Sequence, residues 1–459
     1  MKTRYKVVAG VAILATVAGS TVANSLLTKP EYITATTSAA SIKQLALAGD
    51  TISGFTIQGI PDGMGSYRNE DGTITLLSVH EVPSYGAIGA LAKAADKGKT
   101  IQGTSITKLV LNKAGDRALA ASDFVKTWSF YNYNTKTYQA SPKGAAPTTQ
   151  TLGMDNFISR FCSATLVQAG NLAFKDGSTT YGYDGPVFLA GEEDGDSGYG
   201  RAFAFDMNGN GINLPRMGLA SWENLMPNLK PGKNTVVMGN EDGSATDSQL
   251  FMYVGTKTTE GTFADKAGLT NGDVHVMTIA DVANDNAFRA KYGKNKAVDV
   301  TFAKTIWDAD MKTQQADHDA KATELSRVED GEWDPINPNV FYFPTTESNK
   351  DPGATKPNPA TPTVSRDGGG LWKLTFVDGQ KPELGAKLEL LLDGTEEPYL
   401  SKPDNMEVTS DGIVLIQEDP GKNDLVARIV AFRLKDAKLA TIAQFNPDHF
   451  TTGGSKFMT

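Results

Sequence analysis

The sequence contains one cysteine, Cys162, and only four histidines in 459 residues. With a single cysteine no disulfide can form within the chain, so its core alone must hold it together. Few histidines and a net charge of −9 suit oxygen-liganded cations such as calcium better than zinc. The negative charge also argues against nucleic-acid binding, because phosphate backbones bind positive surfaces.

Long hydrophobic runs are scarce, and the one near the N-terminus has the form of a secretory signal peptide. Three basic residues within 1–6 precede an apolar stretch over 7–18, and small residues follow at 21–25. The stretch is too short to span a bilayer comfortably, although an uncleaved anchor is the alternative. We expect residues 1–25 to be removed. Residues 26–459 would then form a single secreted or periplasmic domain without a membrane span.

Familiar hydrolase motifs are also missing. The sequence has no G-x-S-x-G elbow, no H-E-x-x-H helix and no phosphate-binding Walker loop, so an enzyme here would depend on metals. Residues 206–211 match the first half of an EF-hand calcium loop, but Met217 stands where that loop needs a glutamate. We interpret this segment as a turn between strands, with a cation site as the alternative.

Short strand-like segments separated by turn residues make up most of the chain. They are apolar or alternating runs bounded by Asp-Gly, Asn-Gly and Gly-Gly pairs. Helical patterns are few, over 87–97, 279–291 and 307–325, and the segment 345–370 has the composition of a long surface loop. The expected strands cover 73–77, 187–190, 235–238, 250–254, 340–343, 371–376, 413–416 and 425–432.

An internal repeat indicates the fold class. An apolar strand ends in acidic residues near a glycine at 187–195, 236–243 and 414–421, with looser copies at 76–81 and 327–331. Such repeats predict an all-β propeller of five or six blades with a few peripheral helices. The ends of its inner strands meet at a central channel, where clustered carboxylates repel unless cations neutralise them. The alternative is that each acid is a solvated hairpin residue.

Six segments occur in a fixed order along the chain: LLSVHE at 76–81, SRFCSATL at 159–166, GEE at 191–193, RVEDGEWDP at 327–335, DNMEV at 404–408 and QEDP at 417–420. In this order they resemble the PhoX-type alkaline phosphatases. The resemblance runs from about Ser66 to the end of the chain, and it implies a propeller that holds iron and calcium and hydrolyses phosphate esters.

The resemblance also implies the site residues. The cysteine of the family's R-x-C-S motif ligates iron and corresponds to Cys162, and thiolate suits iron. The arginine two residues before a metal-binding glutamate contacts phosphate and corresponds to Arg327. The carboxylates that would ligate iron or calcium are Glu193, Glu241, Glu329 and Glu418 or Asp419, together with Glu81 and Glu192.

Three functions remain open at this stage. The first is a secreted, metal-dependent phosphatase acting on phosphate esters. The second is a non-catalytic, calcium-stabilised propeller used for binding or surface assembly; it is favoured by Val79, where the family has asparagine, and by the end of the sequence at Thr459. The third is an esterase or lactonase on a calcium propeller, which leaves Cys162 as an inert buried thiol. Iron together with calcium would favour the first function.

Overall fold

The computed structural model describes part of the chain. The predicted signal peptide, the helix expected over 87–97 and most of the loop expected over 345–370 lie outside the described residues. Among the residues described, no helix combines the length and the apolar character needed to cross a membrane. The described residues are 31–82, 104–142, 158, 160–193, 200–244, 247–347, 368–396, 398–419, 426–448 and 450.

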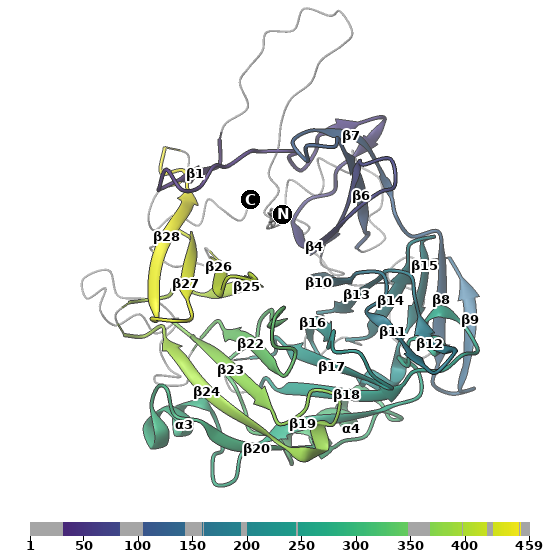
Figure 1. Ribbon diagram of the computed structural model, residues 1–459, viewed down its shortest axis with the longest axis vertical. Coiled ribbons are helices and arrows are strands. Elements are labelled where there is room, and N and C mark those ends of the chain that lie inside the picture. Colours follow the sequence, from purple (N-terminus) through teal and green to yellow (C-terminus); the bar gives the residue numbers. More distant parts are fainter. Residues whose placement is uncertain are drawn as a thin grey trace, which may run out of the picture.

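The described residues form mainly antiparallel sheet, and Figure 1 shows the sheets arranged around a centre. We call the successive sheets blades 1 to 5 in chain order. One edge strand of a blade, which we call its inner strand, lies nearest the centre, as β4, β10, β16 and β25 do in Figure 1. This arrangement confirms the predicted all-β propeller.

Blades 1 and 2 differ in strand order. Blade 1 has the order β4-β5-β6-β7, whereas blade 2 has the order β10-β13-β14-β15-β8-β9, with β8 parallel to β15. The hairpin β11-β12 occupies the segment between β10 and β13. The strands are β4 (Pro61–Arg68), β5 (Ile74–His80), β6 (Thr107–Leu111), β7 (Ala118–Asp123), β8 (Thr127–Asn132), β9 (Thr137–Ser141), β10 (Phe161–Val167), β11 (Leu172–Asp176), β12 (Thr179–Tyr183), β13 (Val187–Glu192), β14 (Ala202–Asp206) and β15 (Asn210–Asn213).

Blades 3 and 4 are joined into one nine-stranded sheet, because β20 pairs with β19 on one side and with β24 on the other. The strands are β16 (Trp222–Pro227), β17 (Asn234–Glu241), β18 (Leu250–Thr256), β19 (Asp273–Thr278), β20 (Val298–Lys304), β21 (Glu332–Trp333), β22 (Val340–Thr345), β23 (Gly370–Phe376) and β24 (Ala386–Asp393).

Blade 5 is completed by the N-terminal part of the chain, since β1 pairs with its outermost strand β28. The chain then crosses to blade 1, where the hairpin β2-β3 contacts β7 and Lys43 forms an ion pair with Asp116 at 2.8 Å. This segment therefore links the last blade to the first. The strands are β25 (Pro403–Val408), β26 (Ile413–Glu418), β27 (Arg428–Arg433), β28 (Lys438–Phe445), β1 (Ile33–Ala35), β2 (Thr51–Ile52) and β3 (Phe55–Thr56).

The helices are short and lie between β18 and β21 in the chain. Two of them begin later than the sequence patterns suggested, because the side chains of Asn284 and Asp310 cap their first turns by accepting backbone N–H bonds. The helices are α2 (Phe263–Lys266), α3 (Asp285–Tyr292) and α4 (Met311–Asp319), with 3₁₀ turns at Pro215–Met217 and Pro382–Leu384.

The apolar core lies between successive blades. On β17, Val237 packs with blade 2, whereas Val236 and Met238 pack with blade 4, because successive side chains of a strand point to opposite faces. Both faces of the strand are buried, which is why it reads as a continuous apolar run in the sequence.

Candidate metal centre

The inner end of every blade repeats one local arrangement. In each blade the inner strand pairs with a neighbour, which we call the second strand. The last residue of the second strand pairs with the opening residue of the inner strand. Beyond this pair, the inner strand carries one residue more than the second strand. Such a β-bulge redirects the next side chain away from the regular sheet face. The opening pairs are Pro61 with His80, Phe161 with Glu192, Trp222 with Glu241, Val328 with Thr345, and Pro403 with Glu418.

The residue that follows each opening residue is a potential metal ligand in all five blades. Another series consists of the residue that directly follows the last residue of each second strand. We call the first series the bulge residues: Asp62, Cys162, Glu223, Glu329 and Asp404. We call the second series the strand-end residues: Glu81, Glu193, Asp242, Thr346 and Asp419.

Seven members of these two series form one cluster. Their ligand atoms fall into three groups, and within each group these atoms lie within 4.8 Å of one another. The groups share Cys162 and Glu223, so they are continuous. We call them together the central cluster: Asp62, Glu81 and Cys162; Cys162, Glu193 and Glu223; Glu223, Glu329 and Asp404.

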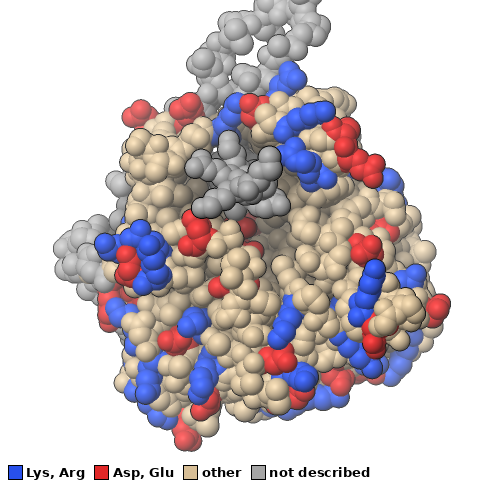
Figure 2. All heavy atoms as spheres, viewed as in Figure 1, with Lys and Arg blue, Asp and Glu red and all other residues tan. Residues whose placement is uncertain are grey.

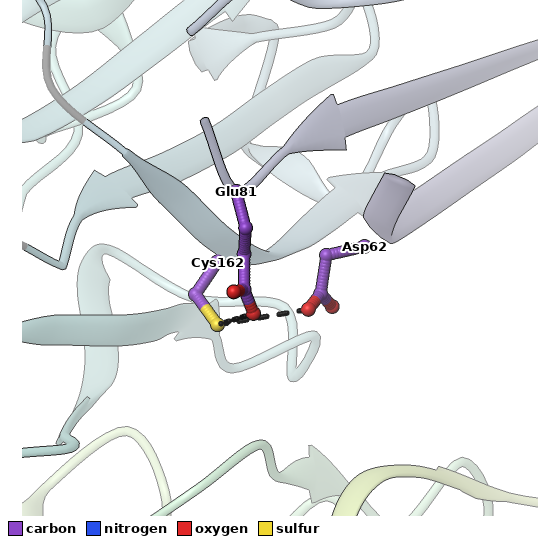
Figure 3. A group of neighbouring side chains, drawn as sticks. All are labelled: Asp62, Glu81 and Cys162. Carbon is purple, nitrogen blue, oxygen red and sulfur yellow. Dashed lines mark hydrogen bonds between the residues drawn. The ribbon is translucent and has the colours of Figure 1, made fainter. Parts of the chain in front are cut away.

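Figure 3 shows the first of these groups, in which side chains from blades 1 and 2 converge. The thiol of Cys162 donates to Glu81 Oε1 at 3.0 Å and to Asp62 Oδ2 at 3.6 Å. Cys162 is 5% exposed and belongs to none of the apolar clusters described here. Its surroundings are therefore those of a ligand set and not those of an inert core thiol.

Burial and mutual repulsion dominate the electrostatics of the central cluster. Burial, reinforced by neighbouring carboxylates, raises the pKa values of Glu223 and Glu329 well above the usual range, and burial raises the pKa of Glu193 to about 8. Burial also raises the pKa of the Cys162 thiol. Several charges of one sign in a buried site require cations or protons to neutralise them.

The central cluster fits bound cations. Both carboxylate oxygens of Glu223, together with Glu193 Oε2 and Asp404 Oδ1, are buried and have no hydrogen-bond partner among the described residues. Buried polar atoms normally have partners, so these oxygens are suited to an ion. Carboxylate oxygens are the ligands of calcium, and a thiolate favours iron.

Three carboxylates expected as ligands do not lie in the central cluster. Glu192 forms a buried ion pair with Arg201, from Nε to Oε2 at 2.6 Å. Glu241 accepts two backbone N–H bonds from its own blade, and Glu418 accepts from Arg428 Nε at 2.8 Å. Each is the first acid of an acidic pair. The structure brings Glu81, Glu193 and Glu329 into the cluster with Cys162, and Asp419 raises the pKa of the nearby Asp404, after burial and Asp62.

We expect Arg201→Met to destabilise the fold and to leave metal binding intact. The change removes the guanidinium that neutralises the buried Glu192 carboxylate, which costs about 3–5 kcal/mol. Thermal unfolding with elemental analysis of the folded protein tests this, and the double variant Glu192→Met/Arg201→Met should recover most of the stability. Loss of metal without loss of stability would instead make Glu192 a ligand.

Arg327, to which the family resemblance assigns phosphate binding, lies beside the central cluster. Its guanidinium donates to both oxygens of Asp242, at 2.7 Å from Nε and 2.5 Å from Nη2, and lies 3.4 Å from Glu329. The side chain is 30% exposed, so a ligand can reach it. On the face shown in Figure 2, the middle of the ring is hollowed and acidic atoms lie at the edge of the hollow.

Two other acidic features lie outside the central cluster. Asp247, Asp319 and Glu324 also come together, and Gln249 donates to all three. Asp206 accepts backbone N–H bonds from Asn208 and from Asn210, at 2.9 and 3.0 Å. Residues 206–211 therefore form a turn between β14 and β15 in which the Asp206 carboxylate is hydrogen-bonded within the segment. This agrees with the turn interpreted from the sequence.

The sequence interpretation missed Asp62, Glu223, Asp404 and Asp242 as site residues. A signal for the first three exists: an apolar or proline residue, a potential ligand and then a small or polar residue open the inner strands of all five blades. The copies are Pro61-Asp62-Gly63, Phe161-Cys162-Ser163, Trp222-Glu223-Asn224, Val328-Glu329-Asp330 and Pro403-Asp404-Asn405.

The chain was compared with curated proteins and with solved structures, and the Pseudomonas fluorescens structure below shares its fold. A search of the curated proteins finds no match. Among solved structures, PhoX of Pseudomonas fluorescens in complex with vanadate has a TM-score of 0.56 and 11% identity, covering 85% of this chain and 80% of that one. An apocarotenoid oxygenase mutant from Synechocystis has a TM-score of 0.33 and 10% identity, covering 90% and 66%.

The family models give the decisive comparison. The model described as alkaline phosphatase PhoX matches residues 204–449, which is more than half of the chain. The matched part includes Glu223, Arg327, Glu329 and Asp404. This chain therefore belongs to the alkaline phosphatase PhoX family.

Proposed function

We propose that this chain is an exported phosphatase that hydrolyses phosphate esters with iron and calcium bound at the central cluster. The observation that carries the proposal is the convergence of six carboxylates and one thiol beside Arg327. Family membership supports the same reaction. The Pseudomonas fluorescens protein of similar fold was solved with vanadate, described as a transition state analogue, which supports a phosphoryl-group ligand.

The ligand types divide the central cluster into two parts. Cys162, with its neighbouring carboxylates, would hold iron, because thiolate is a softer ligand than carboxylate. Glu223, Glu329 and Asp404 offer only oxygen and would hold calcium. When bound, these cations would neutralise the negative charge that develops on the phosphoryl oxygens.

Arg327 would bind and orient the phosphoryl group. Asp242 fixes one edge of its guanidinium, and a planar guanidinium can bind two phosphoryl oxygens at once. The backbone at Arg327 has a φ of 60°, in the left-handed region that is unfavourable for a long side chain. Strain of this kind concentrates at functional sites, where the surrounding structure maintains it. Here Thr346 N donates to Arg327 O at 2.9 Å and supports the conformation.

We expect Arg327→Gln to lower kcat/KM for an aryl phosphate by about 100- to 1000-fold, the usual effect of losing one charge-stabilising donor. The measurement uses the metal-loaded mature protein, with elemental analysis of both proteins and a thermal unfolding curve. Iron and calcium contents should stay at the wild-type level. Full activity in the variant would contradict the role given to Arg327.

One observation favours the second candidate, a calcium-stabilised propeller without catalytic activity. Val79 is fully buried in an apolar cluster with Leu77 and Phe161, so it offers no hydrogen bond where the family has asparagine. The same assay separates the two functions. A loaded wild-type protein that contains calcium but no iron and leaves aryl phosphates intact would support binding in place of hydrolysis.

A further inference from the structure

One position of the blade repeat carries positive side chains around the central cluster. It is the residue immediately before the opening residue of each inner strand. In blades 1 to 5 this position holds Ile60, Arg160, Ser221, Arg327 and Lys402. Arg160 in blade 2 is therefore the structural counterpart of Arg327 in blade 4, and blade 3 lies between them.

Arg160 contacts the central cluster much as Arg327 does. Its Nε donates to the backbone oxygen of Glu193 at 2.9 Å, and Nη2 forms an ion pair with the Glu193 carboxylate. Nη1 lies 3.9 Å from Glu81 Oε2, beyond hydrogen-bond distance. Nη1 therefore has weaker contacts with the protein than Nε and Nη2 have.

The guanidiniums of Arg160 and Arg327 both interact electrostatically with the same two acidic residues, Glu193 and Asp242. Asp242, which binds Arg327 directly, also interacts electrostatically with Arg160. In the same way Glu193, which binds Arg160 directly, also interacts with Arg327. An anion placed near Glu193 and Asp242 once cations neutralise the cluster would lie within the field of both arginines.

Arg160 is more exposed than two other cations close to the blade ends, Arg201 and Lys402. Its side chain is 33% exposed, close to the 30% of Arg327. Arg201, which neutralises Glu192 inside blade 2, is 5% exposed. Lys402, at the equivalent position of blade 5, is 10% exposed and binds Glu347 at 3.1 Å. A ligand can therefore reach the Arg160 side chain as it can reach that of Arg327.

We propose that Arg160 is a second phosphate-binding arginine, which grips the same phosphoryl group as Arg327 from a different blade. The inference rests on the proposed function for the phosphoryl ligand. Two guanidiniums offer two forks and two positive charges, which match the terminal oxygens of a dianionic phosphate monoester. A diester has one negative charge and fewer free oxygens, so it would use the second arginine less.

The test compares Arg160→Gln and Arg160→Lys with the control Arg216→Gln. Arg216 has a similar exposure of 35% but contacts Trp307 and Gly272 away from the central cluster. We expect Arg160→Gln to weaken binding of inorganic phosphate, measured by calorimetry, by about 10- to 100-fold and to lower kcat/KM for an aryl phosphate monoester by about 100-fold. Diester hydrolysis should change by no more than about threefold, since it makes less use of the fork.

Arg160→Lys should recover part of the phosphate affinity, because it keeps the charge but loses the fork. Arg216→Gln should behave as wild type. Unchanged phosphate affinity with full metal content would make Arg160 a counter-ion and overturn the proposal, as would equal losses for monoester and diester. Loss of metal in both Arg160 variants would assign the residue to assembly of the centre and would overturn it too. If the wild type hydrolyses no ester, the proposed function fails, while the calorimetric comparison still decides the role of Arg160.

Discussion

We expect the metal-free protein to lose stability as the pH rises from about 4.5 to about 8. The cause lies in carboxyl groups whose pKa is higher in the folded state than in the unfolded chain. Burial raises the pKa of Glu193 from 4.5 to about 8, and burial and nearby acids raise those of Glu223, Glu329 and Asp404.

The direction of this pH dependence follows from proton binding. Between pH 4.5 and about 8 the folded protein keeps a proton on Glu193 that the unfolded chain releases. This stability is fully present below the unfolded pKa and is lost as the pH passes the folded one. With several such groups, we expect the melting temperature without metal to fall by roughly 10 °C over this range.

Calcium should remove this dependence, because a cation replaces the protons in neutralising the carboxylates. Thermal unfolding after chelation, with and without added calcium at several pH values, measures both effects, and the gain should grow with calcium concentration. Glu223→Gln serves as the matched variant: it should flatten the metal-free slope and weaken the response to calcium. A melting temperature indifferent to chelator, calcium and pH would contradict a buried cation site.

Replacing Cys162 by serine should remove iron and lower kcat by about 1000-fold or more, since a hydroxyl is a poor substitute for a thiolate ligand. The fold should survive, because Cys162 lies in a β-bulge outside the described apolar clusters. Thiolate bonded to ferric iron absorbs visible light, so the wild-type protein should be coloured and the variant colourless. Elemental analysis, absorption spectra and the aryl phosphate assay measure the three effects.

The variant Cys162→Asp provides the control for charge and size. It adds an oxygen ligand, so we expect it to keep calcium-dependent stability but not the absorption band. A colourless wild-type protein whose thiol reacts freely with a labelling reagent after metal loading would remove the basis for an iron–thiolate bond. The central cluster would then be a calcium site only, and the non-catalytic function would be favoured.

The sequence alone was sufficient to predict the repeated strand ends, but it did not show which acid of each pair faces the centre. In Glu192-Glu193, the second acid enters the central cluster and the first pairs with Arg201 inside the blade. In Glu241-Asp242, likewise, the second acid contacts Arg327. Consecutive side chains of a strand point to opposite sides, so a register difference of one residue decides which of the two becomes a candidate ligand.

For the bulge residues, too, the sequence identified some candidates, and only the strand pairing identified the others. Cys162 attracted notice because it is the only cysteine, whereas Asp62 and Glu223 look like ordinary acids in the sequence. Their importance appears only when the pairing of each inner strand with its neighbour reveals the extra residue that turns the side chain inward.

The sequence by itself determined the strand-rich, disulfide-free chain, its turns and its repeated acidic strand ends, because these depend on local propensity and side-chain period. The tertiary structure alone decided that Asp62, Cys162, Glu223 and Asp404 meet, although the first and last are hundreds of residues apart. It also decided that β1 completes blade 5 by pairing with β28. These contacts depend on the order and pairing of whole strands, which local sequence does not specify.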